Sequence, residues 1–550
     1  MTAPRTARRL PAGRSPRAYL AAALTAAPLA VLAFAVPMLR AWPPNSDAAA
    51  QQSIVLTWLR AGHERAFLPP DTWILKLPLY AVVESLPLGS AARITLEAAT
   101  VNALMLALLS AGAWWFAGRA GGTRRRLDVV LPLAWLATLG GGMGRDLSTG
   151  PNYRNVELGL ALAALVLAAR FLPPSDARPR GRRRRRSPAA AAAAAVAAPV
   201  LLAVLWVDDP SFLVLLGLPL LAACLLAAVA PSFGRARRLP SRRRLAAVAV
   251  LVAGSLALAP LLQTALDAAG VSVVGGGTSV SLSPDTVADH LGALRTAVEA
   301  QLHDRGSLGW AAFALGLALL AVAALLCGLL AWRAGRRRDV VLGLLAVHPL
   351  LAVAAVVVKR DFDGVGDGRY LVFAVVDLVV GTAVGLAVLR ARHPRAATTL
   401  TVLVAVAVVG NVTVRVLAGA VDPAAHERQA QVERALLATG ATKGFAEYWS
   451  ANLYVHRTAG AMQLSEVRCG EGGRLQLRDF LTDTARLRVA SPRTVLLFDP
   501  ADDVFRQCPR ARIDAQLGPP AQEVAAPRGT AVLVYPYDIT ARLDPAPPPQ

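Results

Sequence analysis

Long apolar runs follow one another through about the first three quarters of the chain, and they constrain its fold more than any other feature. A run of roughly 20 apolar residues can cross about 30 Å of hydrocarbon as an α-helix. Only 17% of the residues are charged, whereas roughly a quarter are charged in a typical soluble domain. The pattern predicts a polytopic α-helical membrane protein with about 11 transmembrane helices. The expected spans are residues 18–40, 94–118, 127–143, 156–173, 188–206, 210–231, 245–265, 308–332, 340–358, 370–391 and 397–419.

Clusters of arginine between these runs predict the orientation of the chain. In a count of about eleven spans, every cluster falls on one side, which the positive-inside rule assigns to the cytoplasm. The net charge of +22 is concentrated in these clusters, without the interleaved aromatic and basic residues that bind nucleic acid. We therefore expect no nucleic-acid partner. The clusters are the cytoplasmic N-terminus at residues 1–17, Arg124 to Arg126, Arg182 to Arg186, Arg235 to Arg244, Arg336 to Arg338 and Arg390 to Arg395.

Residues 73–88 are apolar, but they do not fit a membrane span. They contain Lys76 and Glu84, and two charges near the middle of a lipid-facing helix are costly. We expect this stretch and residues 52–61 to form helices that lie on or dip into the outer face. Both would belong to a first outer loop at about residues 42–93.

The composition changes near residue 420. We assign residues 18–419 to the transmembrane domain and expect residues 420–544 to form a small extracytoplasmic α/β domain, because an odd number of spans precedes them. Cys469 and Cys508 lie in this domain, and an oxidising location would permit a disulfide between them. The proline-rich residues 545–550 are expected to be a disordered tail.

The tripeptide Asn45-Ser46-Asp47 directly follows the first expected span. Asp47 could take a proton from an acceptor hydroxyl as a general base, or it could cap the helix that follows. These two interpretations are compatible. Asp71, further along the same loop, is open to a similar pair of interpretations, as an N-cap or as a second carboxylate for a metal or the acceptor.

The outer loops also carry basic residues, against the topological preference. The fork of a guanidinium binds phosphate through charge-assisted hydrogen bonds, so we expect these loops to bind an anion. Glu157, at the start of a helix, would either orient such an arginine or form an interfacial pair that only fixes the helix position. The loop that begins at Lys359 could instead be a solvated loop whose charges nearly cancel. The candidates for binding an anion such as a phosphate are Arg145, Arg154, Lys359, Arg360 and Arg369, with Tyr370 beside them.

The adjacent carboxylates Asp208 and Asp209 join two expected spans. Turn and N-cap chemistry explains them, and together with Asp47 they are also weak candidates for binding a divalent cation such as Mg or Mn. The sequence has no HExxH motif, P-loop or GxGxxG turn between a strand and a helix. A zinc peptidase, an ATPase and a dinucleotide enzyme are therefore excluded.

Together these features resemble the GT-C glycosyltransferases, which are integral membrane enzymes that use polyprenyl-phosphate sugars. The resemblance rests on Asp47 after the first span, a long first outer loop, outer arginines that end in Gly368-Arg369-Tyr370, and a soluble domain after about eleven spans. Asn45 stands where some members carry the first carboxylate of an Asp-x-Asp or Glu-x-Asp pair. The segment from Gly444 to Asn452, with the sequence GFAEYWSAN, is similar to segments of uncharacterised bacterial proteins of this type.

The resemblance implies a sugar donor that is held in the outer leaflet as a polyprenyl phosphate. Its phosphate would dock near Arg154, Arg360 or Arg369. Asp47 would deprotonate the acceptor, which would be a glycan, lipid or protein of the cell envelope. Membrane lipid is the other expected partner. The bias towards Ala, Arg, Leu, Val and Pro is typical of high-GC genomes such as those of actinobacteria.

Two other functions remain open at this point. A polytopic transporter or flippase of lipid-linked or envelope components usually has polar groups at the membrane midplane and internal repeats. Here Asp377 is one of few such charges, and no clear repeat is visible. A non-catalytic membrane protein that displays an outer domain would differ from an enzyme on the same fold only at its site.

Overall fold

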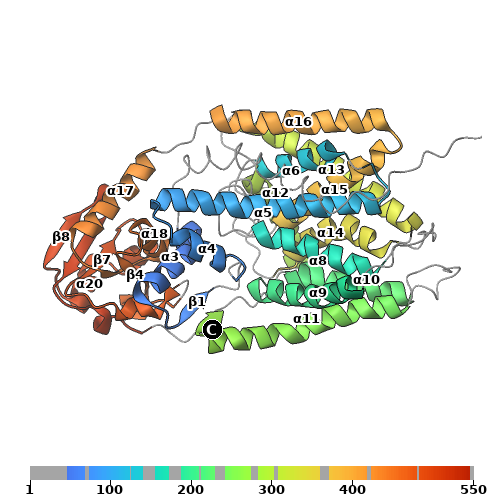
Figure 1. The fold of residues 1–550 in the computed structure, drawn as a ribbon. Helices are drawn as coiled ribbons and strands as arrows, with labels where there is room; N and C mark the ends of the chain where they lie inside the picture. Colours follow the sequence, from blue (N-terminus) through green and yellow to red (C-terminus); the bar gives the residue numbers. More distant parts are fainter. Residues whose placement is uncertain are drawn as a thin grey trace, which may run out of the picture.

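The structure has two regions, a bundle of long helices and a C-terminal domain built on a β-sheet (Figure 1). The first expected span, residues 18–40, lies outside the described residues. The computed structural model describes residues 46–68, 74–123, 125–139, 155–172, 188–209, 212–229, 242–273, 283–302, 307–337, 339–359, 371–417, 423–479 and 482–545.

Each of the other expected spans contains a helix in the structure. Six of the described helices are long and apolar enough to cross a membrane, which confirms the prediction of a polytopic α-helical membrane protein. The bundle consists of α5 (Ser90–Arg119), α6 (Arg126–Ala137), α8 (Asn155–Phe171), α9 (Pro188–Asp208), the π-helical turn η2 (Leu213–Gly217), α10 (Leu218–Val229), α11 (Arg242–Ala268), α13 (Ser307–Arg337), α14 (Val340–Val357), α15 (Val372–Arg390) and α16 (Pro394–Leu417).

Helix α15 runs through the centre of the bundle. It is 83% buried over its apolar window, whereas α11 and α16 are 22% buried and form part of the outer surface. Glycines on α15 let α13 approach closely, since a Cβ atom at Gly385 would lie 2.8 Å from the Cβ of Leu326 and one at Gly381 would clash with the sulfur of Cys327. Small residues at such contacts are a common means of packing helices in membranes.

Two buried ion pairs join helix ends at one end of the bundle. Arg119, which ends α5, donates through Nε to Asp339 Oδ2 at 2.7 Å, and its Nη1 donates to the carbonyl oxygen of Ala169 at 2.9 Å. Arg390, which ends α15, donates through Nε to Asp128 Oδ2 at 2.7 Å. We call this end of the bundle the basic end, and the opposite end, next to the C-terminal domain, the domain end (Figure 1).

The C-terminal domain is built on a six-stranded mixed sheet in the order β5-β4-β3-β7-β9-β8. Strand β3 is parallel to β4 and β7, and the other neighbours are antiparallel. Side chains alternate along β7, so that Val495 and Leu497 pack towards α17 and α18 while Leu496 and Phe498 pack towards α19 and α20. This arrangement confirms the predicted small α/β domain. Its elements are α17 (Pro423–Ala438), β3 (Lys443–Ala446), α18 (Tyr448–Arg457), β4 (Gln463–Cys469), β5 (Leu475–Leu477), β7 (Thr494–Phe498), α19 (Asp503–Gln507), α20 (Arg510–Leu517), β8 (Gln522–Ala525) and β9 (Ala531–Tyr535).

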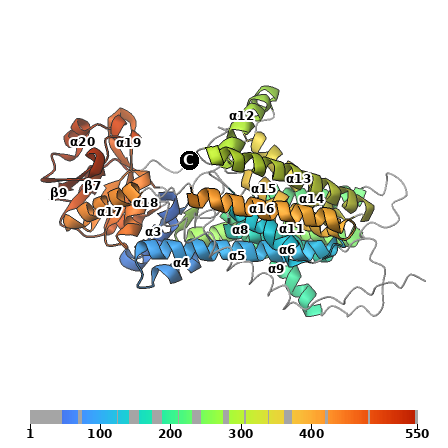
Figure 2. The ribbon, with the colours of Figure 1, turned by 90° about the horizontal axis from the view of Figure 1, so that it is seen from above.

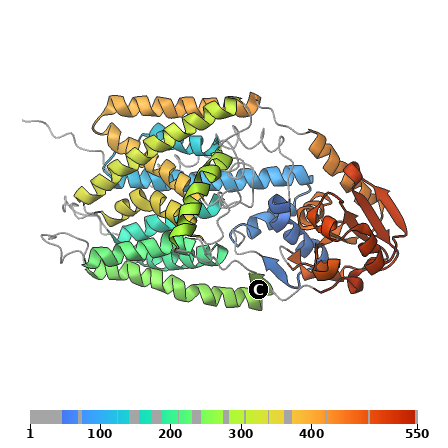
Figure 3. The same ribbon diagram turned by 180° about the vertical axis from the view of Figure 1, so that it is seen from behind.

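Segments of the first outer loop join the two regions. Helices α3 (Ser46–Ala61) and α4 (Leu77–Glu84) lie between the bundle and the sheet, as Figures 1 and 3 both show. A three-stranded sheet in the order β2-β1-β6 also links them. It pairs β1 (Ala66–Leu68) with β2 (Val271–Val273), which follows α11, and with β6 (Thr482–Asp483) of the C-terminal domain. Loops that are far apart in the sequence therefore meet at the domain end.

Helix α12 (Pro284–Leu302) connects α11 to α13 at the domain end and projects from the bundle (Figure 2). His290 anchors it, because its Nδ1 lies 2.8 Å from the carbonyl oxygen of Val357 at the end of α14. Helix α12 is thus attached to the end of α14 at the domain end of the bundle.

Candidate active site

The candidate site begins at the first turn of α3. The helix starts at Ser46, so Asp47 lies within its first turn and not before it as the sequence pattern indicated. One turn further on, the side chains of Gln51 and Gln52 are buried, and Gln52 Nε2 donates to Glu97 Oε2 of α5 at 2.9 Å. The start of α3 is therefore fixed against the bundle at the level of Glu97.

A buried ion pair lies beside this helix. Lys76 Nζ is 3.2 Å from Glu157 Oε2 near the start of α8, and neither side chain is exposed. Asp208, at the end of α9, accepts a hydrogen bond from the backbone N–H of Ile74 at 2.6 Å, and Asp209 next to it is also buried. Buried charges persist only when they are paired. Lys76 thus places a positive charge beside the buried carboxylate of Glu157.

Tyr80, on α4, lies among these carboxylates and is fully buried. Burial raises the pKa of Tyr80 well above its usual value, and the negative charges of the surrounding carboxylates raise it further. Its hydroxyl therefore stays protonated and can act as a hydrogen-bond donor. We define the polar cluster by its buried members Gln52, Lys76, Tyr80, Glu97, Glu157 and Asp208.

A second buried network ties α4 to both regions. Glu84 Oε2 accepts a hydrogen bond from Arg93 Nη1 at 2.6 Å, and Glu84 Oε1 lies 2.9 Å from His456 Nε2 of the C-terminal domain. Glu84 and His456 have no exposed side-chain surface, and they are 372 residues apart in the sequence. The two charges that make residues 73–88 unsuitable as a span, Lys76 and Glu84, are therefore both buried and paired.

Arg486 holds α3 against the C-terminal domain from the other side. Its guanidinium is fully buried and donates to Thr57 Oγ1 at 2.8 Å, Ser53 Oγ at 2.8 Å and Asn452 Oδ1 at 3.0 Å. Asn452 Nδ2 in turn donates to Glu466 Oε1 at 2.8 Å. Burial lowers the pKa of Arg486 to about 10, against the opposing charge of Glu466. The guanidinium therefore stays charged at neutral pH.

The segment from Gly444 to Asn452 serves this docking. Phe445 is buried in the core of the sheet, and the Glu447 carboxylate caps α18 by accepting a hydrogen bond from the N–H of Trp449 at 2.6 Å. Burial raises the pKa of Glu447 to about 7. Asn452 closes the segment by joining the Arg486 network. The GFAEYWSAN motif thus positions α18 against α3.

A cleft of about 540 Å³ lies at the other end of α3, and Arg60, His63 and Arg488 are among its lining residues. His63 Nδ1 is 2.7 Å from Asp483 Oδ2, and His63 Nε2 is 2.9 Å from the carbonyl oxygen of Ala269. Because both of these oxygens are acceptors, both ring nitrogens must donate, and the imidazole is protonated. Burial alone would lower the pKa of His63, but the hydrogen bonds to Ala269 and Asp483 outweigh it and raise the pKa.

The structure brings together three of the residues that the sequence singled out, Glu157, Asp208 and Asp209. Lys359 follows α14 at the same domain end. The other loop candidates, Asp71, Arg145, Arg154, Arg360, Arg369 and Tyr370, lie outside the described residues.

Lys76, Tyr80 and Glu97 are not among the residues that the sequence pattern indicates as candidates for the site. Lys76 could have been identified as unusual, because its charge interrupts an apolar stretch. Its pairing with Glu157 could not have been identified, because Glu157 lies 81 positions away along the sequence. Within the described ranges, no three His, Cys, Asp or Glu side chains are grouped so as to hold a metal ion. We therefore derive no step through the divalent cation that the sequence left open.

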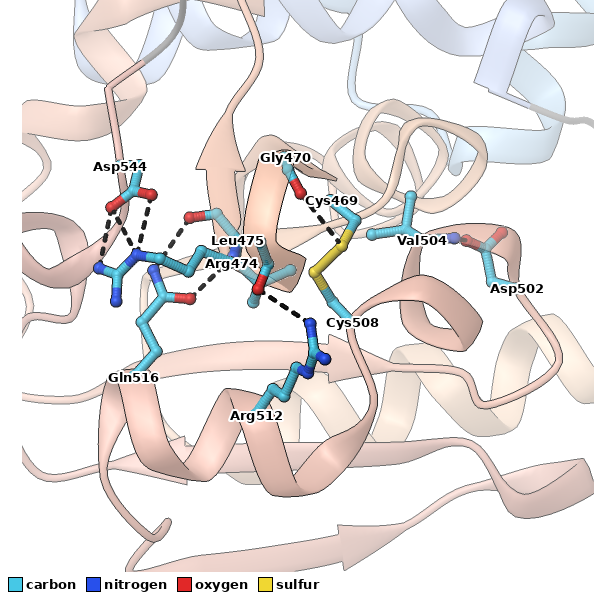
Figure 4. The surroundings of a disulfide bond; sticks show 11 residues. Cys469, Gly470, Arg474, Leu475, Asp502, Val504, Cys508, Arg512, Gln516 and Asp544 are labelled. Atoms are coloured by element: carbon cyan, nitrogen blue, oxygen red, sulfur yellow. Dashed lines mark hydrogen bonds and ion pairs between the residues drawn. A yellow bond between two sulfur atoms is a disulfide. The ribbon is translucent and has the colours of Figure 1, made fainter.

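A disulfide joins Cys469 at the end of β4 to Cys508 after α19 (Figure 4). The Cα atoms of the two residues are 5.7 Å apart, and 39 positions separate them in the sequence. Nearby, Gln516 accepts a hydrogen bond from the N–H of Leu475 at 2.7 Å and donates to its carbonyl oxygen at 3.0 Å. The disulfide and these two hydrogen bonds together fix the edge of the sheet at β4 and β5.

The fold of nearly the whole chain is shared with a solved structure, in agreement with the polytopic helical architecture that the resemblance implies. The apo structure of ArnT from Cupriavidus metallidurans matches 96% of this chain and 98% of that chain, with a TM-score of 0.53 at 13% identity. The apo oligosaccharyltransferase of Archaeoglobus fulgidus matches 82% of this chain with a TM-score of 0.46 at 13% identity, and this chain spans 64% of its length. This second likeness is too weak to carry a conclusion. No protein-family model and no curated protein matches the sequence.

Proposed function

We propose that the protein transfers a sugar from a polyprenyl-phosphate donor to an acceptor at the domain end of the bundle. The observation that supports this most is the buried polar cluster around Lys76 and Glu157, which lies at the domain end of a GT-C fold beside the helix that carries Asp47. Burying paired charges costs free energy that packing alone does not repay. A cluster of this kind is therefore more consistent with a role in catalysis than with a role in stabilising the fold.

We infer that the domain end faces away from the cytoplasm. The disulfide between Cys469 and Cys508 lies in the domain at this end, and disulfides persist in oxidising compartments. Arg126, Arg337 and Arg390, which belong to three different arginine clusters of the sequence, lie at the opposite end, where the positive-inside rule favours the cytoplasm. The N-terminus would then be cytoplasmic, and the acceptor would be a glycan, lipid or protein of the cell envelope.

In the proposed reaction, Asp47 accepts the proton of an acceptor hydroxyl. The acceptor oxygen attacks the anomeric carbon, and the bond from that carbon to the phosphate oxygen breaks. The polyprenyl phosphate leaves with the bonding electrons, and cations that face its oxygens stabilise the developing charge. The candidates for this role are the loop residues Arg145, Arg154, Lys359, Arg360 and Arg369.

The test is transfer of a radiolabelled hexose or pentose from synthetic polyprenyl phosphates to envelope fractions by the full chain in proteoliposomes. We expect Asp47→Asn to lower transfer by about 10²- to 10⁴-fold, because the acceptor proton has no base to accept it. The matched control is Asp285→Asn, which removes an exposed carboxylate of α12 at the same end. Full activity of Asp47→Asn, with unchanged thermal unfolding, would exclude the assigned base.

One observation favours a transporter or flippase as the second candidate. His348 of α14 hydrogen-bonds to Asp377 of α15, and its other ring nitrogen contacts the carbonyl oxygen of Leu215 in the π-helical turn η2. Ionisable residues inside membrane helices often mark transport pathways. If Asp377→Asn stopped movement of a lipid-linked sugar across proteoliposomes while Asp47→Asn did not, transport would replace transfer as the function.

A further inference from the structure

The basic end of the bundle carries a cavity that sugar transfer does not require. It measures about 250 Å³ and lies between α13 and the turn that joins α15 to α16. Leu329, Val388 and Leu389 give it an apolar floor, and Arg392 and His393 form part of its rim. An apolar floor with a basic rim suits a ligand that has both a hydrocarbon part and an anionic part.

The guanidinium groups of two arginines stack on the ring of Trp332 beside this cavity. The Cζ of Arg336, one turn further along α13, is 4.4 Å from the centroid of the indole ring, and the Cζ of Arg392 is 5.2 Å from it. Trp332 itself is 44% exposed. Stacking on an aromatic ring orients a guanidinium and leaves its N–H groups available to an anion. The two arginines are therefore preorganised around one point.

The carboxylates described at this end are already paired with other arginines. Asp339 pairs with Arg119, and Asp128 pairs with Arg390. In the part of the chain that the structure describes, neither Arg336 nor Arg392 has a carboxylate partner, and both are exposed. Two positive charges thus remain uncompensated beside an apolar cavity.

We propose that this cavity binds an anionic phospholipid, with the headgroup phosphate between Arg336 and Arg392 and the hydrocarbon on the apolar floor. The cavity lies where α13 ends, which is the level of the lipid headgroups on that side of the membrane. Tryptophan is enriched at this level, and basic residues at it attract anionic lipids. Arginines that only set topology need neither a cavity nor a shared aromatic ring.

The experiment uses the full chain in nanodiscs of phosphatidylcholine in which phosphatidylglycerol is increased stepwise. We expect the unfolding temperature to rise with phosphatidylglycerol. The variant R336Q/R392Q should lose most of this rise, with apparent lipid binding weaker on the order of tenfold. Trp332→Leu keeps both charges and removes the ring that orients them, so it should lose part of the rise. Arg395→Gln is the matched control, because it removes an exposed arginine at the same end that does not contact Trp332.

Three results would overturn the proposal. The first is an unfolding temperature of the native chain that does not depend on phosphatidylglycerol. The second is an equal loss in Arg395→Gln, which would show that general surface charge attracts the lipid. The third is the same rise when inorganic phosphate is added to pure phosphatidylcholine nanodiscs, which would assign the site to free phosphate. If R336Q/R392Q does not fold, R336K/R392K keeps the charge but not the planar fork and should show an intermediate rise.

Discussion

The two ends of the helix bundle use charged residues in opposite ways. At the domain end, Lys76, Glu84 and Glu157 are fully buried and are paired across elements from different parts of the chain. At the basic end, Arg119 and Arg390 also form buried pairs, but exposed arginines such as Arg392 are left without a carboxylate in the described residues. The charges named at the domain end are thus buried and paired, whereas the basic end also has exposed positive charges in excess.

This difference distinguishes charged residues that take part in the proposed catalysis from those that orient the chain in the membrane. Exposed positive charge orients the chain in the membrane by its sign, and orientation alone needs no defined geometry. A buried, balanced cluster needs defined geometry and costs desolvation free energy. The comparison predicts that removing a buried charge of the polar cluster changes transfer, while removing a buried charge at the basic end changes stability alone.

The largest effect is expected from Lys76→Met. Glu157 would then be buried without its partner, and loss of one member of such a pair costs about 3–5 kcal/mol of unfolding free energy. Transfer per folded molecule should also fall, because the cluster loses its cation. Thermal unfolding in detergent and transfer in proteoliposomes measure the two effects separately.

The matched control for this prediction is Arg119→Met at the basic end, which leaves Asp339 unpaired in the same way. It should lower stability by a similar amount and leave transfer per folded molecule unchanged. The double variant K76M/E157Q should regain stability, since residue 157 no longer carries a charge without its partner, but it should not regain transfer. If Arg119→Met reduced transfer as much as Lys76→Met, the distinction between the two ends would fail.

Part of this comparison could be predicted from the sequence. The length of the apolar runs predicted the positions of the described spans, and the arginine clusters predicted which end of each span is basic. Both are local properties of the chain, so the sequence alone reports them. The charges of Lys76 and Glu84 also marked residues 73–88 as something other than a span. Their partners could not be predicted, since Glu84 meets His456 from 372 residues away and neither periodicity nor propensity reports on contacts at that range. Helix α3 begins at Ser46, before the stretch 52–61 that we expected to be helical, and it ends at Ala61 as expected.

The next largest effect is expected at the disulfide of the C-terminal domain. In the variant C469S/C508S, the unfolded domain regains the freedom of a loop of 39 positions. Chain entropy then lowers the unfolding free energy by about 4 kcal/mol. Limited proteolysis of the domain with and without reductant measures this change.

Reductant should not affect C469S/C508S, and it should leave the bundle intact, because the described cysteines there, Cys224 and Cys327, are free and buried. In intact cells, a thiol reagent that does not cross the membrane should label Cys469 in the single variant Cys508→Ser. It should not label a cysteine that replaces Arg395. Equal labelling of both positions would contradict the inference that the two ends face different compartments.

The smallest effect concerns the protonated His63 at the junction of the two regions. The pKa of His63 in the folded protein lies above the ordinary histidine value of 6.5, because the hydrogen bonds to Ala269 and Asp483 outweigh the effect of burial. A group whose pKa is raised on folding stabilises the folded state fully below its unfolded pKa, and this contribution is lost as the pH rises through the folded pKa. The difference in unfolding temperature between the native chain and His63→Gln should therefore shrink as the pH is raised from about 5.5 to about 9.

The difference between the two proteins isolates His63 from other titrating groups. Glu447, whose pKa is raised to about 7, lowers stability as the pH rises through neutrality, but it does so equally in both proteins and cancels. The pKa of Asp483 is lowered by its hydrogen bonds despite partial burial, so it stays ionised over this range. Glu64 and Arg488 also face the cleft, but they pair with each other at 2.5 Å in both proteins. A difference that stays constant with pH would mean that His63 is neutral in the junction, and the cleft would then carry one positive charge fewer.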